Sequence, residues 1–95
     1  MEVVGLSDIE GFLRRHPECR QDIADLAREL ESRAIPDTNA LKQWYPSAKV
    51  ITGSIVVFKI RGNQYRLTTR FAFNTQLVVL LVLETHADYD ARRYR

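Results

Sequence analysis

The stretch Phe58-Lys59-Ile60-Arg61-Gly62-Asn63-Gln64-Tyr65-Arg66-Leu67 holds a Gly-Asn pair between two runs in which apolar and polar residues alternate. This pattern predicts a hairpin of two antiparallel strands with a two-residue turn, in which Gly62 supplies a positive φ angle. The turn fixes the register, so that Arg61 faces Gln64 and Lys59 faces Arg66. One face of the hairpin is then apolar and carries Phe58, Ile60, Tyr65 and Leu67. The other face is cationic and carries Lys59, Arg61, Gln64 and Arg66.

The cationic face predicts an anionic partner. Like charges directly opposite each other on neighbouring strands are unfavourable by roughly a few tenths to 1 kcal/mol, so the Lys59–Arg66 pair indicates that an anion such as a phosphate completes the face. Residues 1–40 hold nine acidic and five basic side chains, a balance of −4, whereas residues 41–95 hold three and nine, a balance of +6. Such polarity favours a polyanionic partner for the second half, although two solvated faces can also differ by chance.

The size and composition of the chain predict a small intracellular protein. Its 95 residues are expected to form a single domain, residues 1–95, with one core. The only cysteine, Cys19, excludes an internal disulfide, and zinc-type Cys spacing is absent, so we expect neither a metal nor another cofactor. The apolar run Leu77–Leu83 is far shorter than the roughly 20 residues of a membrane span. We therefore expect a cytoplasmic protein without a membrane partner.

Helical periodicity dominates the first half of the chain. Residues 7–15 are expected to form a helix that starts with a capping box at Ser7. A second, amphipathic helix should begin near Pro17. Thr38 or Asn39 is expected to cap a brief helical turn.

Alternating apolar residues dominate the second half and predict strands over residues 50–52, 55–61, 64–73 and 76–83. The last strand is apolar at every position from Leu77 to Leu83, as in strands that are covered on both faces. The fold class is therefore α+β, with two N-terminal helices packed on a four-stranded, mainly antiparallel sheet and a short C-terminal helix.

A histidine, a phenol and a carboxylate follow the last strand closely. Thr85, with Asp88 three residues later, has the pattern of a helix start. One face of that helix carries four residues with the spacing i, i+3, i+4 and i+7, namely His86, Tyr89, Asp90 and Arg93.

The register of the last two strands decides whether this helix lies beside the cationic hairpin. A two-residue turn at Asn74-Thr75 pairs Arg66 with Leu83. His86 then lies within three residues, roughly 10 Å, of Arg66. A β-bulge would shift this pairing.

Such a cluster suits the cleavage of RNA by attack of a ribose 2′-OH on the adjacent phosphate. This reaction needs a base, an acid and positive charge around the phosphorane. His86 can serve as base or acid, because imidazole exchanges protons near neutral pH, and Asp90 can orient it. The guanidinium of Arg66 matches a phosphate, with Lys59 and Arg61 as further clamps.

Plainer interpretations of the same residues remain open. His86 and Asp90 can form a local surface pair, and Arg66 and Lys59 can be neutralised by Glu84 or Asp88. In the RNA-cleavage interpretation, by contrast, Tyr89 can donate a proton or stack on an unpaired base. Tyr65 and Trp44 are expected in the core.

The chain resembles a known family through Trp44 and Pro46, the stretch from Phe58 to Leu67, and Thr85, His86, Tyr89 and Asp90. On these residues, and over roughly residues 16 to 90, it is similar to the HigB-type toxins of type II toxin-antitoxin systems, within the RelE-like group of bacterial ribonucleases. The resemblance implies a RelE-like α+β fold and an mRNA interferase, that is, an endoribonuclease that cuts mRNA on the translating ribosome without a metal. It also implies a cognate antitoxin of helix-turn-helix type.

The positions that match the family motifs are Asn63 and Arg66 in the first and Thr85, His86, Tyr89 and Asp90 in the second. With the chemistry of the cationic face, this predicts a catalytic group of Arg66, His86, Tyr89 and Asp90 and an RNA-binding group of Lys59, Arg61, Asn63, Arg70 and Thr85. Glu84 stands where the family pattern has a small residue, and its charge would either weaken RNA binding or pair with Arg66 when RNA is absent.

Two questions stay open at the level of the sequence. A non-catalytic module that binds RNA or a protein through the basic face is the alternative to a ribonuclease. The antitoxin, in turn, could cover the cationic cleft or hold the acidic N-terminal helices.

Overall fold

A single mixed sheet organises the residues that the structure describes. The computed structural model covers residues 1–93, without the side chain of Arg93. The strands are β1 (Glu2–Val4), β2 (Lys49–Val50), β3 (Ile55–Ile60), β4 (Tyr65–Ala72) and β5 (Leu77–Thr85). They lie in the order β1-β5-β4-β3-β2, and β1 and β5 are parallel while the other neighbours are antiparallel.

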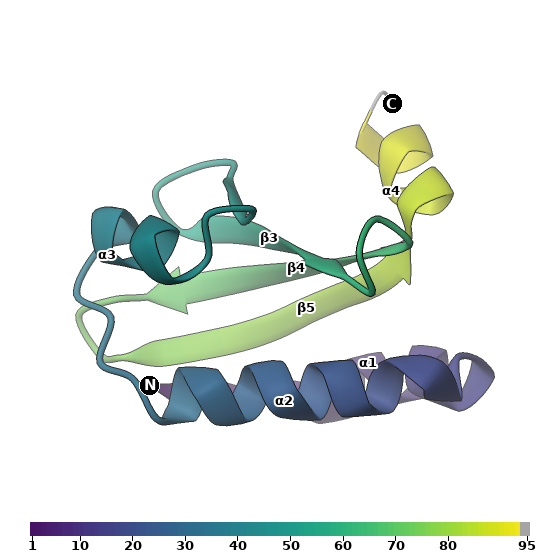
Figure 1. Ribbon diagram of the computed structural model, residues 1–95, viewed down its shortest axis with the longest axis horizontal. Coiled ribbons are helices and arrows are strands. Elements are labelled where there is room, and N and C mark those ends of the chain that lie inside the picture. Colours follow the sequence, from purple (N-terminus) through teal and green to yellow (C-terminus); the bar gives the residue numbers. More distant parts are fainter. Residues whose placement is uncertain (94–95) are drawn as a thin grey trace.

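Helices precede, interrupt and follow this sheet. They are α1 (Leu6–Arg15), the 3-10 turn η1 (Pro17–Cys19), α2 (Arg20–Glu31), α3 (Thr38–Trp44) and α4 (His86–Arg93). Helices α1 and α2 cover one face of the sheet, whereas α4 follows β5 at the end where the β3–β4 turn lies (Figure 1). The helices bury Ile9, Leu13, Ile23 and Leu30 against a sheet face formed by Val56, Phe58, Ile60, Tyr65, Leu67, Phe71, Val78, Leu80 and Leu83. The predicted α+β class is confirmed.

The sheet has one strand more than predicted. Strand β1 pairs in parallel with the start of β5, with Val3 opposite Val78. Three residues are too few for alternation to reveal a strand, so the four-stranded prediction was wrong in this detail. Strand β1 makes β5 an internal strand, in agreement with its apolar sequence. The face of β5 away from the helices is not fully covered, because Val82 is 38% exposed.

The register of the hairpin agrees with the prediction. Phe58 pairs with Leu67, Lys59 with Arg66 and Ile60 with Tyr65. The loop is longer than predicted, since the ladder ends at Ile60 and Tyr65 and a turn covers residues 61–64. Both Gly62 and Arg61 have positive φ angles, of 66° and 52°. The Gln64 backbone N–H still donates to the Arg61 oxygen at 3.3 Å, but the two residues are not ladder partners, and the predicted place of Arg61 on the cationic face is wrong.

A β-bulge changes the pairing of β4 with β5. Phe71 pairs with Val78, as the turn at Asn74-Thr75 predicts, but the register shifts between Thr68 and Thr69. Beyond the shift Arg66 pairs with Glu84, not with Leu83 as predicted. The bulge thereby turns Leu83 into the core, where it is 5% exposed.

Two helix starts differ from the sequence prediction. Helix α1 begins at Leu6 after Gly5, whose φ is 97°, and no side chain caps it, so the predicted capping box at Ser7 is absent. Asp37, and not Thr38 or Asn39, caps α3 through the hydrogen bond that Oδ1 accepts from the Ala40 backbone N–H at 2.9 Å.

Aromatic residues near these helices lie partly outside the core. Tyr65 is buried as predicted, at 8% exposed, but Trp44 is 55% exposed. The guanidinium of Arg33 lies 4.1 Å from the centroid of the Trp44 ring, so a cation replaces the predicted core contact. None of the helices in the described part of the chain is both long and apolar enough to span a bilayer.

Candidate functional site

A cleft of about 280 Å³ opens where the β3–β4 hairpin meets the start of α4. It is lined by Ser47, Lys49, Val57, Lys59, Arg66, His86, Tyr89 and Asp90. The ladder places Lys59 beside Arg66, and the bulged β5 delivers α4 to the same end of the sheet. The structure therefore brings together all four predicted catalytic residues and Lys59.

Arg66 is the most constrained charge in this cleft. Its side chain is buried, with 7% of the residue exposed. Nη1 donates to the backbone oxygens of Asn63 (3.3 Å) and Tyr65 (3.2 Å), and Nη2 donates to Asn63 Oδ1 at 2.7 Å. Three of the five N–H groups of a guanidinium are thus used, and two have no partner among the described residues. All three acceptors are neutral, although a buried charge is costly without an opposite charge.

Two lysines share the cleft with Arg66. Lys59 is its direct neighbour across the ladder, and Lys49 is opposite Val57 on the same face of the sheet. Within residues 1–92, neither lysine forms an ion pair or a side-chain hydrogen bond. The sequence analysis missed Lys49 because it started the strand at Val50. Lys49 reaches this face only through the pairing of β2 with β3, which the alternation within one strand does not indicate.

His86 is held at both ring nitrogens. Nε2 lies 2.9 Å from Asp90 Oδ2, and Nδ1 lies 3.5 Å from Asn63 Nδ2. The backbone N–H of His86 also donates to the Gln64 oxygen at 2.9 Å, which ties the start of α4 to the hairpin loop. If the amide of Asn63 donates to Nδ1, the ring proton of neutral His86 lies on Nε2 and faces Asp90.

Helix α4 starts as the sequence predicts. Thr85 Oγ1 accepts a hydrogen bond from the Asp88 backbone N–H at 3.1 Å, which is the geometry of an N-cap. Thr85 does not line the cleft, so its hydroxyl orients the helix that carries His86. The side chain of Arg93, predicted on the same face as His86, lies outside the described residues.

Tyr89 completes the wall of the cleft, and Glu84 lies outside its lining. Glu84 accepts hydrogen bonds from Arg92 Nε and Nη2 at 3.0 and 2.7 Å, and this contact raises the pKa of Arg92. The expected pairing of Glu84 with Arg66 is therefore not found, although the two residues are opposite each other in the ladder. Tyr89 is 8% exposed, so its ring is a buried wall of the cleft.

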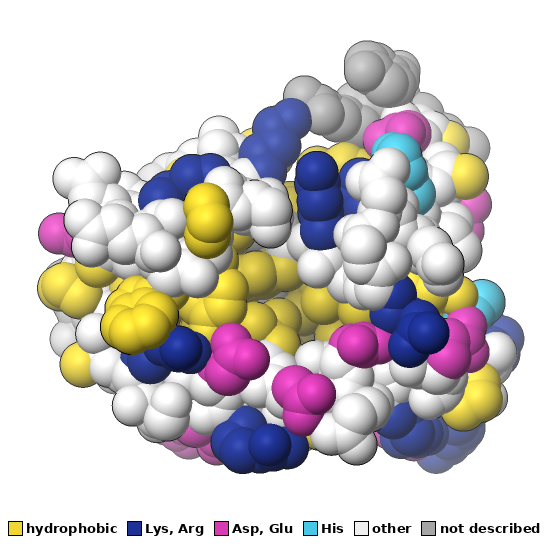
Figure 2. All heavy atoms as spheres, in the orientation of Figure 1, with side chains coloured by type: hydrophobic (Ala, Val, Ile, Leu, Met, Phe, Trp, Pro, Cys, Tyr) yellow, Lys and Arg dark blue, Asp and Glu magenta, His cyan; other side chains and the backbone are white. Residues whose placement is uncertain are grey.

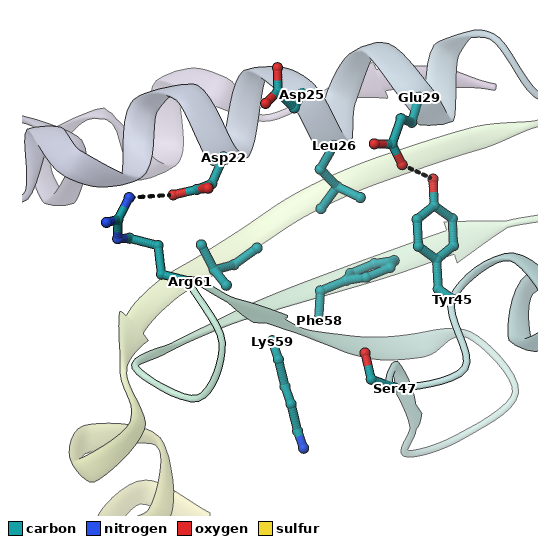
Figure 3. A pocket seen from close by; sticks show the side chains of 10 residues that line it. Asp22, Asp25, Leu26, Glu29, Tyr45, Ser47, Phe58, Lys59 and Arg61 are labelled. Atoms are coloured by element: carbon teal, nitrogen blue, oxygen red, sulfur yellow. Dashed lines mark hydrogen bonds and ion pairs between the residues drawn. The ribbon is translucent and has the colours of Figure 1, made fainter.

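Arg61 and Arg70 lie elsewhere. Arg61 points toward α2, where Nη1 is 3.2 Å from Asp22 Oδ2 and 3.1 Å from the Glu18 oxygen, whereas Lys59 points away from that helix (Figure 3). Its predicted place on the cationic face is wrong because the positive φ at Arg61 takes its side chain out of the strand alternation. Arg70 lies on the same face as Arg66 but further along β4, outside the cleft.

A second groove, of about 220 Å³, lies between α2 and β3. Its floor includes Phe58 and Ile60, and Leu26 and acidic residues of α2 line one side, so that Figure 2 shows an apolar hollow beside acidic side chains. Asp22 and Glu29 contact Arg61 and Tyr45. This groove is unsuited to a phosphate, and the cationic cleft is the candidate site.

The cleft is not built like a metal centre. Among the residues that the structure describes, no group of three or more histidine, cysteine or carboxylate side chains is placed to hold a metal ion.

Comparison with known families settles the class of protein. The model of the HigB toxin family, described as the RelE-like toxic component of a toxin-antitoxin system, matches residues 19–92. The chain belongs to this family. The match includes every residue that lines the cationic cleft, and the mixed sheet of this HigB-family toxin is compatible with a RelE-like fold. Family membership also implies an antitoxin partner. A search among curated proteins found no match to the chain.

Proposed function

We propose that this HigB-family toxin is an endoribonuclease that cleaves mRNA on the translating ribosome and thereby inhibits translation. The observation that supports this most directly is the buried guanidinium of Arg66, which has only neutral acceptors and shares a cleft with two lysines and the His86–Asp90 pair. A phosphate would supply the missing negative charge.

The proposed reaction is a transfer of the phosphoryl group within the RNA. The ribose 2′-oxygen forms a bond to phosphorus while the bond to the 5′-oxygen of the next nucleotide breaks. A base takes the 2′-OH proton, and an acid gives a proton to the departing oxygen. The products are a 2′,3′-cyclic phosphate and a 5′-hydroxyl end. The reaction as written needs neither an oxidant nor a metal ion.

His86 is the proposed proton-transfer group. Its Nδ1 faces the hairpin and has only a long contact with Asn63, while Nε2 is held by Asp90. A proton taken up at Nδ1 gives an imidazolium whose charge is stabilised by Asp90. Tyr89, which also lines the cleft, is the proposed second proton-transfer group.

The cations are proposed to hold the phosphates. Arg66 stabilises the charge that develops on the phosphorane, because its planar fork can donate two parallel hydrogen bonds. Lys59 and Lys49 bind the RNA backbone beside it. Asn63 is a positioning residue that fixes Arg66, and Arg70 can contact RNA further along β4.

Induced expression in bacteria tests this function. We expect the wild-type toxin to stop growth and to produce mRNA fragments with 5′-hydroxyl ends. Arg66→Ala should reduce cleavage by about 10²- to 10³-fold, because it removes a transition-state donor, whereas Arg28→Ala, on exposed α2, should not. If the wild type neither stops growth nor yields cut ends, the ribonuclease proposal fails.

His86→Ala distinguishes the enzyme from a non-catalytic binding module. Loss of a general acid or base should lower cleavage by about 10²- to 10⁴-fold while RNA binding persists. A module that acts by binding alone would keep its effect in His86→Ala and lose it when Lys59 and Arg66 are both replaced by glutamine. Cleavage of one mRNA with and without ribosomes then tests the proposed ribosome dependence.

The proposed function also defines the partners and the compartment. Translating ribosomes place the toxin in the cytoplasm, and we expect an antitoxin of helix-turn-helix type. Co-expression of that antitoxin should restore growth.

A further inference from the structure

The groove between α2 and β3 has no role in the proposed ribonuclease reaction. The groove and the cationic cleft share Ser47 and Lys59 in their linings. The side chain of Lys59 points away from α2 (Figure 3), and the residues of α2 that line the groove do not line the cleft. Phe58 and Ile60 form its floor, and Leu26 and Tyr45 are half-buried at its sides. Exposed apolar hollows with polar rims are typical of interaction sites.

The groove continues into an exposed aromatic cluster. Arg33 Nη1 donates to the Tyr45 hydroxyl at 2.9 Å, and its guanidinium lies 4.1 Å from the centroid of the Trp44 ring. Trp44 is 55% exposed, the largest exposed fraction among the large hydrophobic side chains of the described residues. Tryptophan, tyrosine and arginine are the residue types that contribute most to the affinity of protein interfaces.

The opposite rim is acidic. Asp22, Asp25 and Glu29 all line the groove from α2. Their present ion-pair partners are Arg61, Arg28 and the half-buried Arg33. The three carboxylates themselves lie at the surface, where ion pairs contribute little to stability. Because residues 1–40 carry a balance of −4, this side of the molecule attracts basic partners.

We propose that this groove is the docking site of the antitoxin, and that its occupant is an antitoxin segment with apolar side chains flanked by lysine or arginine. The apolar side chains of the segment cover Leu26, Phe58 and Trp44, and its basic side chains meet the acidic rim of α2. The proposal depends on membership of the HigB family, which implies an antitoxin, and not on the ribonuclease reaction. It assigns the antitoxin to the acidic helical side of the molecule rather than to the cationic cleft.

Binding of the purified cognate antitoxin tests the site, with the toxin produced as Arg66→Ala so that toxicity does not limit expression. Trp44→Ala should weaken binding by about 30-fold or more, as expected for an interface anchor. Leu6→Ala, which shortens a side chain that is 48% exposed on α1, should change the affinity less than about 2-fold.

Charge reversal gives a second test that does not depend on Trp44. Asp25→Lys should lower the association rate by about 10-fold or more at low salt, with a smaller effect at high salt. Glu31→Lys is the matched control, because Glu31 is exposed on the same helix but does not line the groove. Thermal unfolding of each variant separates a loss of binding from a loss of folding.

Neutralisation in cells completes the experiment. With Arg66 intact, Trp44→Ala and Asp25→Lys toxins should stop growth as the wild type does and resist rescue by the antitoxin. Normal binding and rescue of both variants would overturn the docking site. Loss of binding in Lys49→Gln instead would place the antitoxin over the cationic cleft, because Lys49 lines the cleft and not the groove. A toxin dimer that Trp44→Ala dissociates would assign the groove to a second copy of the chain. If the wild-type toxin never stops growth, the proposed ribonuclease function is contradicted. The binding measurements would still decide whether the antitoxin docks in the groove, because they do not depend on toxicity.

Discussion

The decisive single residue is Arg66, because it is buried and its hydrogen-bond acceptors among the described residues are all neutral. Asn63 contributes both its backbone oxygen and its side-chain oxygen to the guanidinium, and its amide nitrogen lies near His86. A residue expected mainly as part of a turn thus connects the two halves of the cleft. This network requires the positive φ of Arg61 and Gly62, which shapes the loop that presents Asn63.

A second residue-level contact ties the hairpin to the helical layer. The Tyr65 hydroxyl donates to Glu18 Oε2 at 2.6 Å. This hydrogen bond lowers the pKa of Glu18 below its ordinary value of 4.5, and together with burial it raises the pKa of Tyr65 to about 12. The ring of Tyr65 packs edge-on against Phe12 and His16.

Tyr65→Phe should make stability depend less on pH. A carboxyl group whose pKa is lower in the folded than in the unfolded protein stabilises the fold above its unfolded pKa, and this stabilisation is lost as pH falls through the folded pKa. The variant should therefore melt below the wild type at pH 7, and the difference should shrink at pH values well below 4.5. The raised pKa of Tyr65 contributes stability below pH 10 that is lost as pH rises toward 12.

Thermal melts over a pH series measure this effect. In a Glu18→Gln background, Tyr65→Phe should have a smaller effect and no acid-side pH dependence. A difference between wild type and Tyr65→Phe that stays constant from neutral to acidic pH would contradict the assignment.

Among the elements, the short strand β1 and the bulge in β5 determine how the sheet connects to α1 and to α4. Strand β1 completes the sheet beside β5 and leads directly into α1 through Gly5. The bulge shifts β5 by one residue, so that Leu83 enters the core and Glu84 leaves it. Without that shift, the last residues of β5 would present the opposite face, and α4 would start in a different direction.

Gly5→Ala should destabilise the protein by more than about 2 kcal/mol. Gly5 has a φ of 97°, and a Cβ atom there would lie 2.5 Å from the Leu80 backbone oxygen. Gly11→Ala is the matched control, because Gly11 lies inside α1 and its Cβ would meet nothing closer than 3.9 Å. Helix propensity predicts that Gly11→Ala stabilises the protein by about 0.5–1 kcal/mol. Urea unfolding of both variants measures these changes, and equal effects would show that Gly5 has no special backbone requirement.

At the scale of the whole molecule, the two halves of the chain differ in charge and in role. The acidic balance of residues 1–40 lies mainly on the helical layer, whereas the basic balance of residues 41–95 includes the lysines and arginine of the cleft. Helices thus supply the apolar cover for the sheet, and the hairpin and α4 supply the candidate site.

RNA binding should depend on salt through the two cleft lysines. The logarithm of the RNA-binding constant falls linearly with the logarithm of the salt concentration. Each phosphate contact that is lost should reduce the steepness of this slope by about 0.7 for single-stranded RNA. We therefore expect Lys49→Gln and Lys59→Gln each to reduce the slope by about that amount. Arg28→Gln, on α2, should leave it unchanged. Fluorescence anisotropy with a short 2′-deoxy-substituted RNA measures these slopes without cleavage, and unchanged slopes in both lysine variants would remove them from the RNA-binding surface.

The predictions from sequence succeeded where a signal was local. The alternation around the Gly-Asn pair defined which hairpin residues face the core, and the Thr85–Asp88 spacing defined the start of α4. They failed where the outcome depended on a distant segment. Trp44 lies at the surface with the guanidinium of Arg33 over its ring. Arg61 left the cationic face because its positive φ takes the side chain out of the strand alternation, and it contacts Asp22 and Glu18 instead.

The sequence by itself determined the α+β class, the apolar and cationic faces of the hairpin, and the candidate residues Lys59, Arg66, His86, Tyr89 and Asp90, because strand alternation and helix spacing repeat every few residues. Only the tertiary structure decided that Lys49 joins the cleft, that Arg61 leaves it, and that Glu84 binds Arg92. Those outcomes depend on the pairing of β2 with β3, on the bulge in β5 and on the positive φ of Arg61. Such features arise from contacts between segments that are distant along the chain, so no short pattern encodes them.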